Sequence, residues 1–391
     1  MYTSEQIKQM AREQYEWAVN TRRALHRIPE KGFEEHKTKA LIAQRLEEIG
    51  VEYDMPSGGW ITAYVPGNQP GKITAFRADF DALPITEPEG CPFGSGQPGY
   101  MHACGHDMHT AVLLSLGCLL KNAPDGFPGG CLLMFEPAEE TEGGAKPMAE
   151  SGMMEKYGVD RVYGLHVMPR LIVGQVETRP LTLNAGTDSV LIRVRGTRSH
   201  GAYPENGTDA IVCASVLVTA LQTLVSRNVS PLENAVLTIG TIKGGEASNI
   251  ICDEVEMTGT LRTADRTLHD KMVRRILETC EGTGKAFGCR IEAEVKEGYS
   301  ALVNTPEHAA RVLETAKELF GSENALIKEA PSMGAEDFSY FLDHAPGAFF
   351  HVGCSPDADH IGAPLHSEKF CPDERAMEIG IAKEAALVMR P

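Results

Sequence analysis

The chain is short of basic residues and of long apolar runs. Lys and Arg number 37 against 54 Asp and Glu, so the formal net charge of the 391 residues is -17. An acidic chain without a dense Lys/Arg cluster repels phosphate backbones, and nucleic acid is therefore not an expected partner. The longest apolar run that stands out, near residues 111–120, is too short to span a bilayer, so no membrane association is expected.

A secretory signal is also not expected, because residues 1–6 have neither the basic start nor the apolar run of a signal peptide. The 10 cysteines are scattered along the chain. In a cytoplasmic protein they are expected to be reduced thiols, so an important cysteine would be a ligand or a nucleophile. Hydrophobic residues at 42% and charged residues at 23% fit a globular protein of one large or two ordinary domains.

Strand and helix patterns alternate in the first half of the chain. Apolar runs predict strands at residues 61–65, 73–78, 131–135 and 162–167. Helical spacing predicts helices at residues 34–49 and 106–120, and Thr3 and Gln6 resemble a capping box that opens an N-terminal helix. The alternation predicts an α/β domain whose central sheet is flanked by helices.

The pattern changes over residues 188–296. Strands are expected near residues 190–194, 235–242, 255–261 and 291–295, and helices at 209–224 and 268–280. The order β-α-β-β-α-β is that of a ferredoxin-like α+β domain. We therefore expect an inserted second domain at 188–296, with residues 1–187 and 297–391 forming the first, which resumes with helices at 306–319 and 373–389.

Cys104 and His106 flank Gly105 on a loop before a predicted helix. A loop can turn both side chains toward one point, whereas positions i and i+2 of a helix do not share a face. Thiolate and imidazole suit zinc and related divalent ions. A structural cysteine beside a histidine at a helix start is the alternative interpretation.

Three further sites follow strands or lie in loops. Glu139 and Glu140 follow the apolar run 131–135, and His166 ends another, where ligands of open α/β sheets gather. Neighbouring carboxylates point in different directions, so one can bind a metal ion while the other faces substrate. Taken singly, a solvated acidic turn and a core histidine explain these residues, and His366 in its Gly/Pro loop would be a surface histidine.

Together these residues supply the ligands that two metal ions about 3.5–4 Å apart require, with one carboxylate left as a base. Two other classes of protein stay open. In a cysteine-nucleophile hydrolase, Cys104 would attack and a histidine would be the base, but the glutamate pair and two histidines would be unused. A non-catalytic metal-binding or scaffold protein would leave Glu139 without a role.

The chain resembles the peptidase M20 metallohydrolases, in the branch of hippurate hydrolases, N-acyl-amino-acid amidohydrolases and plant auxin-conjugate hydrolases. The likeness covers nearly the whole length and implies a metal-dependent exopeptidase-like catalytic domain with an inserted lid or dimerisation domain. The stretches that carry it, in family order, are residues 25–30, 77–84, 102–109, 137–140, 164–166, 199–204, 333–338 and 364–366.

By that resemblance, Cys104, His106, Glu140, His166 and His366 hold two divalent metal ions, with the Cys104 thiolate bridging. The thiolate favours zinc, while the other ligands also accept manganese, and nickel or cobalt are further alternatives.

The same likeness assigns roles to five other residues. Glu139 resembles the general base, and Asp81 the carboxylate that orients a ligand imidazole. His200 would reach the active site of a partner subunit and stabilise the oxyanion, which implies a homodimer formed through the inserted domain. Asn249 and Arg262 would hold the free carboxylate of the substrate, although a surface histidine and an ion pair with a neighbouring acid are alternatives for His200 and Arg262.

The activity implied is hydrolysis of the amide bond of N-acyl amino acids, such as N-acetyl or N-benzoyl compounds, to a carboxylate and a free amino acid. M20-type carboxypeptidase or dipeptidase activity and deacetylation of N-acetyl-diaminopimelate are alternatives. The chain departs from the family at Glu136, where Gln is common. This extra carboxylate could alter metal preference or local pKa values.

Overall fold

The computed structural model describes residues 2–390, which divide into two compact units. Unit 1 comprises the chain up to Leu183, Val303–Glu329 and the chain from Asp337 onward. Unit 2 comprises Asn184–Leu302 and Ala330–Glu336. The insertion expected at 188–296 lies inside unit 2, whereas no sequence pattern predicts the short second segment of that unit.

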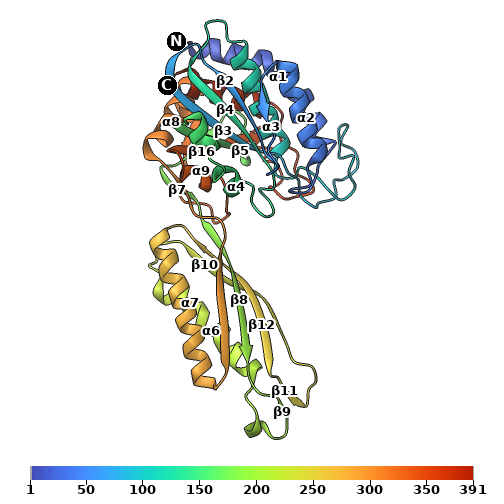
Figure 1. Ribbon diagram of the computed structural model, residues 1–391, viewed down its shortest axis with the longest axis vertical. Helices are drawn as coiled ribbons and strands as arrows, with labels where there is room; N and C mark the ends of the chain where they lie inside the picture. The colour runs from blue at the N-terminus through green and yellow to red at the C-terminus, as the bar shows by residue number, and fades with distance from the viewer. Residues whose placement is uncertain (1, 391) are drawn as a thin grey trace. The chain divides into compact units, whose positions relative to one another are not determined.

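A mixed sheet of eight strands forms the centre of unit 1, in the order β1-β2-β4-β3-β5-β16-β6-β15 (Figure 1). The strands β4, β3, β5 and β16 run parallel to one another, while β2 and β6 run antiparallel to their neighbours in this group. The predicted central mixed sheet is therefore confirmed. The strands are β1 (Tyr53–Asp54), β2 (Ile61–Pro66), β3 (Gln69–Asp79), β4 (Pro128–Glu136), β5 (Arg161–Ile172), β6 (Val176–Thr178), β15 (Ala325–Ile327) and β16 (Gly347–Ser355).

Helices flank this sheet, and α3 is the one that carries part of the site. It contacts β3, β4 and β5 and is itself covered by α1 and α10 (Figure 1). Almost every residue of α3 is buried, which explains why its sequence is apolar on all sides. The helices of unit 1 are α1 (Ser4–His26), α2 (His36–Ile49), α3 (His106–Lys121), α4 (Ala145–Ala149), α5 (Met153–Tyr157), α8 (Pro306–Phe320), α9 (Ser339–Leu342) and α10 (Ala376–Met389), with a 3-10 turn at Ser322–Asn324.

Local sequence signals set the ends of the first two helices. The capping box is present, because the Gln6 amide donates to Thr3 Oγ1 and the Thr3 amide donates to Gln6 Oε1. Helix α2 ends at Gly50, whose φ of 70° is the left-handed conformation that glycine adopts without strain.

Unit 2 contains an antiparallel sheet in the order β10-β12-β8-β13, with α6 and α7 packed on it (Figure 1). This order, with the sequence β8-α6-β10-β12-α7-β13, is the expected ferredoxin-like topology. Asp209 and Asp265 cap the two helices through their side chains. The elements are β8 (Gly186–Arg195), β9 (Ser199–His200), α6 (Ala210–Asn228), β10 (Ala235–Gly244), β11 (Ile250–Ile251), β12 (Glu254–Thr263), α7 (Arg266–Phe287) and β13 (Arg290–Glu297), with a 3-10 turn at Pro204–Asn206; β7 (Leu181–Asn184) and β14 (Leu302–Asn304) pair where the chain passes between the units.

Helix α6 corrects one expectation from the sequence, since it is a longer apolar segment than the run at 111–120. By length and composition alone its 19 residues could cross a membrane. In the structure one face of α6 packs on the sheet of unit 2 through Ala214, Leu217 and Leu221, among others. Since 33% of the apolar segment is buried, α6 is a partly buried helix of unit 2.

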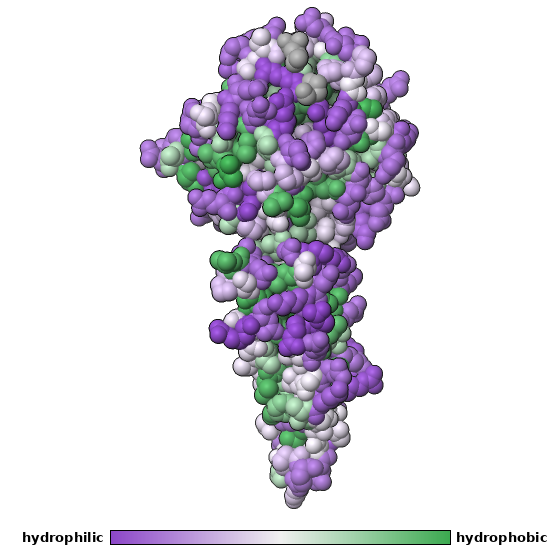
Figure 2. Space-filling view, turned by 90° about the vertical axis from the view of Figure 1, so that its left-hand side faces the viewer, coloured by the Kyte–Doolittle hydropathy of each residue, from purple (hydrophilic) through white to green (hydrophobic). Residues whose placement is uncertain are grey.

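Each unit has its own apolar core. The core of unit 1 lies between the sheet and α1, α3, α8 and α10, and that of unit 2 between its sheet and its two helices. The face shown in Figure 2 is mostly hydrophilic on both units, with smaller apolar patches, as the burial of the apolar residues requires.

Leu217→Ala should lower the free energy of unfolding of unit 2 by about 2–5 kcal/mol, because Leu217 is fully buried and its truncation leaves a cavity. Gln222→Ala on the exposed side of the same helix is the control and should change it by less than about 0.5 kcal/mol. Denaturant unfolding followed by circular dichroism measures both, and equal effects would contradict the packing described for α6.

Candidate active site

The candidate site lies where the parallel strands β3 and β4 end, beside the middle of the longer strand β5. β3 ends at Asp79 and leads to Asp81, and β4 ends at Glu136 and leads to Glu139 and Glu140. The register pairs Asp79 with Glu136, so the two strands end side by side. Carboxyl ends of parallel strands are the usual location of sites in α/β folds, and here they bring acidic side chains from distant parts of the chain together.

Asp81 fixes the orientation of His106 at the start of α3. The His106 Nδ1 lies 3.0 Å from Asp81 Oδ1, while the other oxygen of Asp81 accepts the Glu140 amide at 3.0 Å. Because Nδ1 donates to the carboxylate, Nε2 is the nitrogen left available for a metal ion. This atom is buried and has no hydrogen-bond partner among residues 2–390, which is the arrangement of an imidazole held ready for a metal ion.

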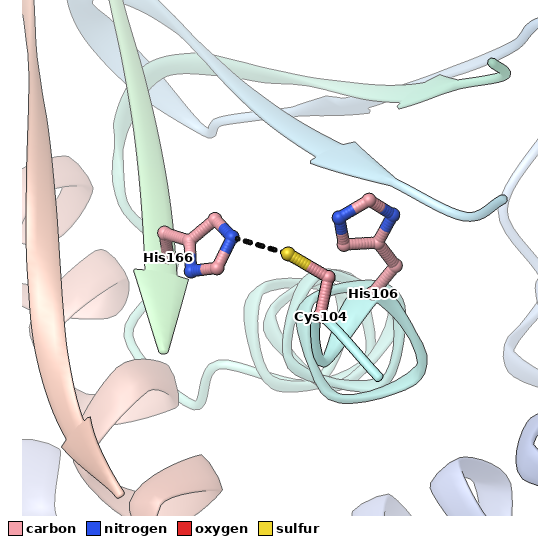
Figure 3. A group of neighbouring side chains, drawn as sticks. All are labelled: Cys104, His106 and His166. Carbon is pink, nitrogen blue, oxygen red and sulfur yellow. Dashed lines mark hydrogen bonds between the residues drawn. The ribbon is translucent and has the colours of Figure 1, made fainter. Parts of the chain in front are cut away.

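Cys104, in the loop just before α3, and His166, on β5, face each other (Figure 3). The Cys104 Sγ lies 3.2 Å from His166 Nε2, and His166 Nδ1 donates to the Val167 carbonyl at 2.6 Å. Gly105 has a φ of 94°, and a Cβ there would lie 2.4 Å from the Val167 side chain. Glycine is thus required between the two ligand candidates.

His366 reaches the same cluster from the C-terminal part of the chain. Its Nε2 lies 2.9 Å from Glu140 Oε1, and its amide donates to the Ala103 carbonyl at 2.9 Å. His366 has a φ of 62°, a conformation that is strained for a residue with a side chain. From the loop sequence alone, His366 was expected to be a surface histidine. These two contacts place it beside Glu140.

The candidate metal ligands converge. Three groups overlap, and in each the possible ligand atoms lie within 4.8 Å of one another: Cys104 with His106 and His166, Cys104 with Glu140 and His366, and His106 with Glu139 and Glu140. Thiolate, imidazole and carboxylate together are a suitable donor set for transition-metal ions such as zinc. The residues present therefore fit the metal ions that the family resemblance implies.

The electrostatics of the cluster favour positive charge at its centre. Burial, followed by the charges of Glu140 and Glu139, raises the pKa of the Cys104 thiol well above its usual value. Against the effect of burial, Asp79 and Asp81 raise the pKa of His106 to about 10. Burial and the neighbouring His109 hold the pKa of His166 well below its usual value, so this imidazole is neutral and able to coordinate a cation.

Beneath the cluster, the guanidinium of Arg77 is buried among three carboxylates. Its Nε donates to Glu136 at 2.6 Å, and its two terminal nitrogens donate to Asp79 at 2.5 Å and to Asp337 at 2.9 Å. All four side chains are fully buried in unit 1. A buried guanidinium with this geometry stabilises carboxylates that would otherwise be costly to bury.

Asp79 also fixes His109, the last histidine of the stretch 102–109. The His109 Nδ1 donates to Asp79 at 2.6 Å, and its Nε2 accepts the Val167 amide at 2.9 Å. Both nitrogens are engaged in hydrogen bonds, so His109 supports the strand beside His166 and does not compete for a metal ion.

The Arg77 contacts give Glu136 a partner that the sequence did not predict. From the sequence we expected this extra carboxylate to alter metal preference or local pKa values. In the structure its Oε2 accepts from Arg77, so it serves the ion network beneath the site. A glutamine at this position can accept the same hydrogen bond, which explains why either residue fits.

Three residues with expected roles lie in unit 2. His200 is exposed on β9, and the pairing of β9 with β11 places it next to Asn249, whose carbonyl accepts the Gly201 amide at 2.7 Å. Arg262 lies near the opposite end of β12 and donates to the Met333 carbonyl at 3.0 Å. The alternative from the sequence paired Arg262 with a neighbouring acid, whereas in the structure Arg262 donates to this backbone oxygen.

Sequence reasoning assigned no role to Arg77, Asp79, His109 or Asp337. A signal existed for two of them, since Arg77 and Asp79 are charged residues two positions apart in the otherwise apolar end of β3. Residues at i and i+2 of a strand share a face, so a buried cation paired with a carboxylate could have been inferred there.

The chain belongs to the peptidase family M20/M25/M40, whose profile matches residues 75–390. N-acetyldiaminopimelate deacetylases of two Streptococcus pneumoniae strains are 38% identical to it over 378 residues, which cover 95% of this chain and 98% of theirs. The family and these relatives make the protein a hydrolase of amide bonds.

Two solved structures share the fold at substantial sequence identity. A protein described as an aminohydrolase, from methicillin-resistant Staphylococcus aureus, superposes with a TM-score of 0.91 at 36% identity and 98% coverage of both chains. The YxeP protein of Bacillus subtilis, described as a dinuclear metal binding peptidase from the M20 family, gives a TM-score of 0.84 at 30% identity, covering 96% of this chain and 98% of that one.

Glu136→Gln should leave metal content and metal preference unchanged and lower the free energy of unfolding by about 1 kcal/mol, because a neutral hydrogen bond to Arg77 replaces a charged one. Arg77→Met should cost about 3–5 kcal/mol, since it leaves three buried carboxylates uncompensated. Denaturant unfolding and elemental analysis measure both effects. Altered metal selectivity in Glu136→Gln would show that Glu136 acts on the metal site after all.

Proposed function

We propose that this protein is a metal-dependent deacetylase that hydrolyses the amide bond of N-acetylated diaminopimelate, a diamino dicarboxylic acid. The observation that carries the proposed chemistry is the convergence of Cys104, His166 and His366 on Glu139 and Glu140, from four separate segments of unit 1. The choice of substrate is supported by the relatives, which cover nearly the whole chain and carry this activity in their names.

This proposal narrows the expectation drawn from the sequence. There, N-acyl amino acids in general were the main interpretation, with hippurate hydrolases among the nearest activities, and N-acetyl-diaminopimelate was an alternative. The relatives at 38% identity support the alternative. Because N-acetyl-diaminopimelate is itself an N-acyl amino acid, the chemistry required of the site is unchanged.

Cys104, His106, Glu140, His166 and His366 would hold two divalent cations, with zinc or manganese as the leading candidates and nickel or cobalt as alternatives. When bound, the cations would lower the pKa of water and polarise the amide carbonyl. Cys104, His106 and Glu140 each belong to two of the overlapping ligand groups, and the family resemblance makes the Cys104 thiolate the group that would be shared by the two cations.

Glu139 would act as the general base and then as the general acid. Its carboxylate accepts a proton from the attacking water as the water oxygen bonds to the amide carbon, and it donates that proton to the nitrogen as the C–N bond breaks. The products are acetate and a free amine. Asp81 would support this chemistry by holding His106 and the Glu140 amide in place.

His200 would stabilise the oxyanion, while Asn249 and Arg262 would hold a carboxylate of the substrate. Within one subunit, Arg262 is separated from the β9 end of unit 2 by most of the ten-residue strand β12, which is about 25 Å. A small substrate cannot reach both ends. This separation supports the proposal that a partner subunit supplies His200 together with its neighbour Asn249, and that the working enzyme is a homodimer.

The proposed location is the cytoplasm. The 10 cysteines are all free thiols in the structure, including those buried in the two cores. Reduced thiols are the normal state in that compartment.

Chelation followed by reconstitution tests the metal dependence and the substrate together. We expect removal of metal to abolish release of acetate from N-acetyl-diaminopimelate, and zinc, manganese, cobalt or nickel to restore it. Across a panel that adds N-acetyl and N-benzoyl amino acids, N-acetyl-diaminopimelate should have the highest kcat/KM. Activity that survives complete metal removal would favour the cysteine-nucleophile alternative, and preference for N-benzoyl substrates would overturn the deacetylase assignment.

Glu139→Gln should retain bound metal and lose most of kcat, by about 100-fold or more, because the amide cannot accept the proton. Glu142→Gln is the matched control, since Glu142 is an exposed carboxylate three residues along the same loop. Steady-state kinetics and elemental analysis distinguish the two variants. Normal turnover by Glu139→Gln would remove Glu139 as the base.

A further inference from the structure

The turn that carries Glu139 is held by two buried carboxylates. Asp81 accepts the Glu140 amide at 3.0 Å on one side, and Glu35 Oε1 accepts the Ala138 amide at 3.0 Å on the other. Glu139 lies between these two anchored amides. Its position therefore depends on both carboxylates.

Ala138 has a φ of 62°, a left-handed conformation that costs a residue with a Cβ about 1 kcal/mol or more. The Ala138 carbonyl accepts the amides of Gly143 at 3.0 Å and Thr141 at 3.3 Å, which closes the turn. On its other side, the Ala138 amide donates to Glu35. A strained conformation persists only when its surroundings over-determine it, and Glu35 is one of these surroundings.

We propose that Glu35 is a positioning residue of this site: by holding the Ala138 amide it fixes the turn and thereby the direction in which the Glu139 carboxylate leaves the backbone. This inference rests on the proposed function, because it assigns Glu35 an effect on the residue proposed as the base. It also gives a role to the segment that follows the family-like stretch 25–30.

The segment between α1 and α2 is built to bring Glu35 to this place. Glu30 anchors it at two points, because its carbonyl accepts the Ala82 amide at 2.8 Å and its carboxylate accepts the amides of Lys37 and Thr38 at the start of α2, each at 2.9 Å. The first contact attaches the segment to the chain just beyond β3, and the second attaches it to α2. Glu35 is thereby held from both directions.

Gly32 lies directly against the Glu139 turn. A Cβ at this position would lie 2.2 Å from the Thr141 hydroxyl and 2.9 Å from the Ala138 Cα. Only glycine allows the two segments to approach this closely. The contact places the main chain of the segment on the same turn that the Glu35 side chain holds.

Glu35 itself is fully buried. Burial raises the pKa of Glu35 to about 7, and its carboxyl keeps an oxygen that can accept from Ala138 whether or not it is protonated. Glu35 can therefore hold the Ala138 amide through the length of its side chain and its accepting oxygen, without needing a charge. A glutamine, which has an accepting oxygen at the same distance from the backbone, should replace it.

Three substitutions test the proposal in the metal-loaded, full-length protein, with N-acetyl-diaminopimelate as the probe. Glu35→Gln keeps the acceptor and should retain kcat within about threefold. Glu35→Leu removes the acceptor, and Glu35→Asp withdraws it by one methylene. Both should lower kcat by about 10- to 100-fold, the usual effect of a small misplacement of a reacting group, with KM and bound metal unchanged.

Glu34→Gln is the matched control, because Glu34 is the exposed neighbour that pairs with Lys31 at 3.4 Å and should behave as the unaltered protein. If Glu35→Leu does not fold, the comparison of Glu35→Asp with Glu35→Gln decides the question. Unchanged kcat in Glu35→Asp, or loss of bound metal in place of kcat, would overturn the proposal. Failure of the unaltered enzyme on the whole substrate panel would overturn the proposed function instead, so the two failures are distinguishable.

Discussion

The buried guanidinium of Arg77 is the interaction on which the candidate site depends. It joins the ends of β3 and β4 to Asp337, a residue far away in sequence, and offsets the charge of three carboxylates in a place without water. Through Asp79 its influence reaches His109 and then the Val167 amide beside His166. The candidate metal ligands thus lie on a fully buried polar network.

Two of the four non-glycine residues with a positive φ among residues 2–390 lie beside the candidate site. Ala138 and His366 both have a positive φ, although neither is a glycine. Each is held by hydrogen bonds to segments distant in sequence, from Glu35 in one case and Ala103 in the other. Strained residues cost free energy wherever they occur, so their presence beside Glu139 and Glu140 indicates that the fold maintains this geometry at the expense of stability.

The sequence predicted the features that depend on local spacing. Apolar periodicity located α3 and the ferredoxin-like unit, the capping box located the start of α1, and Glu139 and Glu140 follow a strand as expected. The prediction that His166 ends its strand is wrong, because β5 continues to Ile172 and His166 lies within it. Features that depend on tertiary contacts were not predictable. Arg262 donates to a carbonyl in a segment about seventy residues away, and Glu136 accepts a hydrogen bond from Arg77. Strands such as β6 and β15 are too short to show an apolar period.

The position of β16 has a consequence for how the protein is made. In the sheet of unit 1, β16 lies between β5 and β6, although it comes after all of unit 2 in the chain. During synthesis from the N-terminus, β5 therefore lacks its neighbour on one side until residue 355 has been added, and His366 joins Glu140 later still. Most of unit 2 is one continuous stretch and can fold in the meantime. Until β16 has been made, β5 of the nascent chain therefore has an open strand edge, which is a known risk for aggregation.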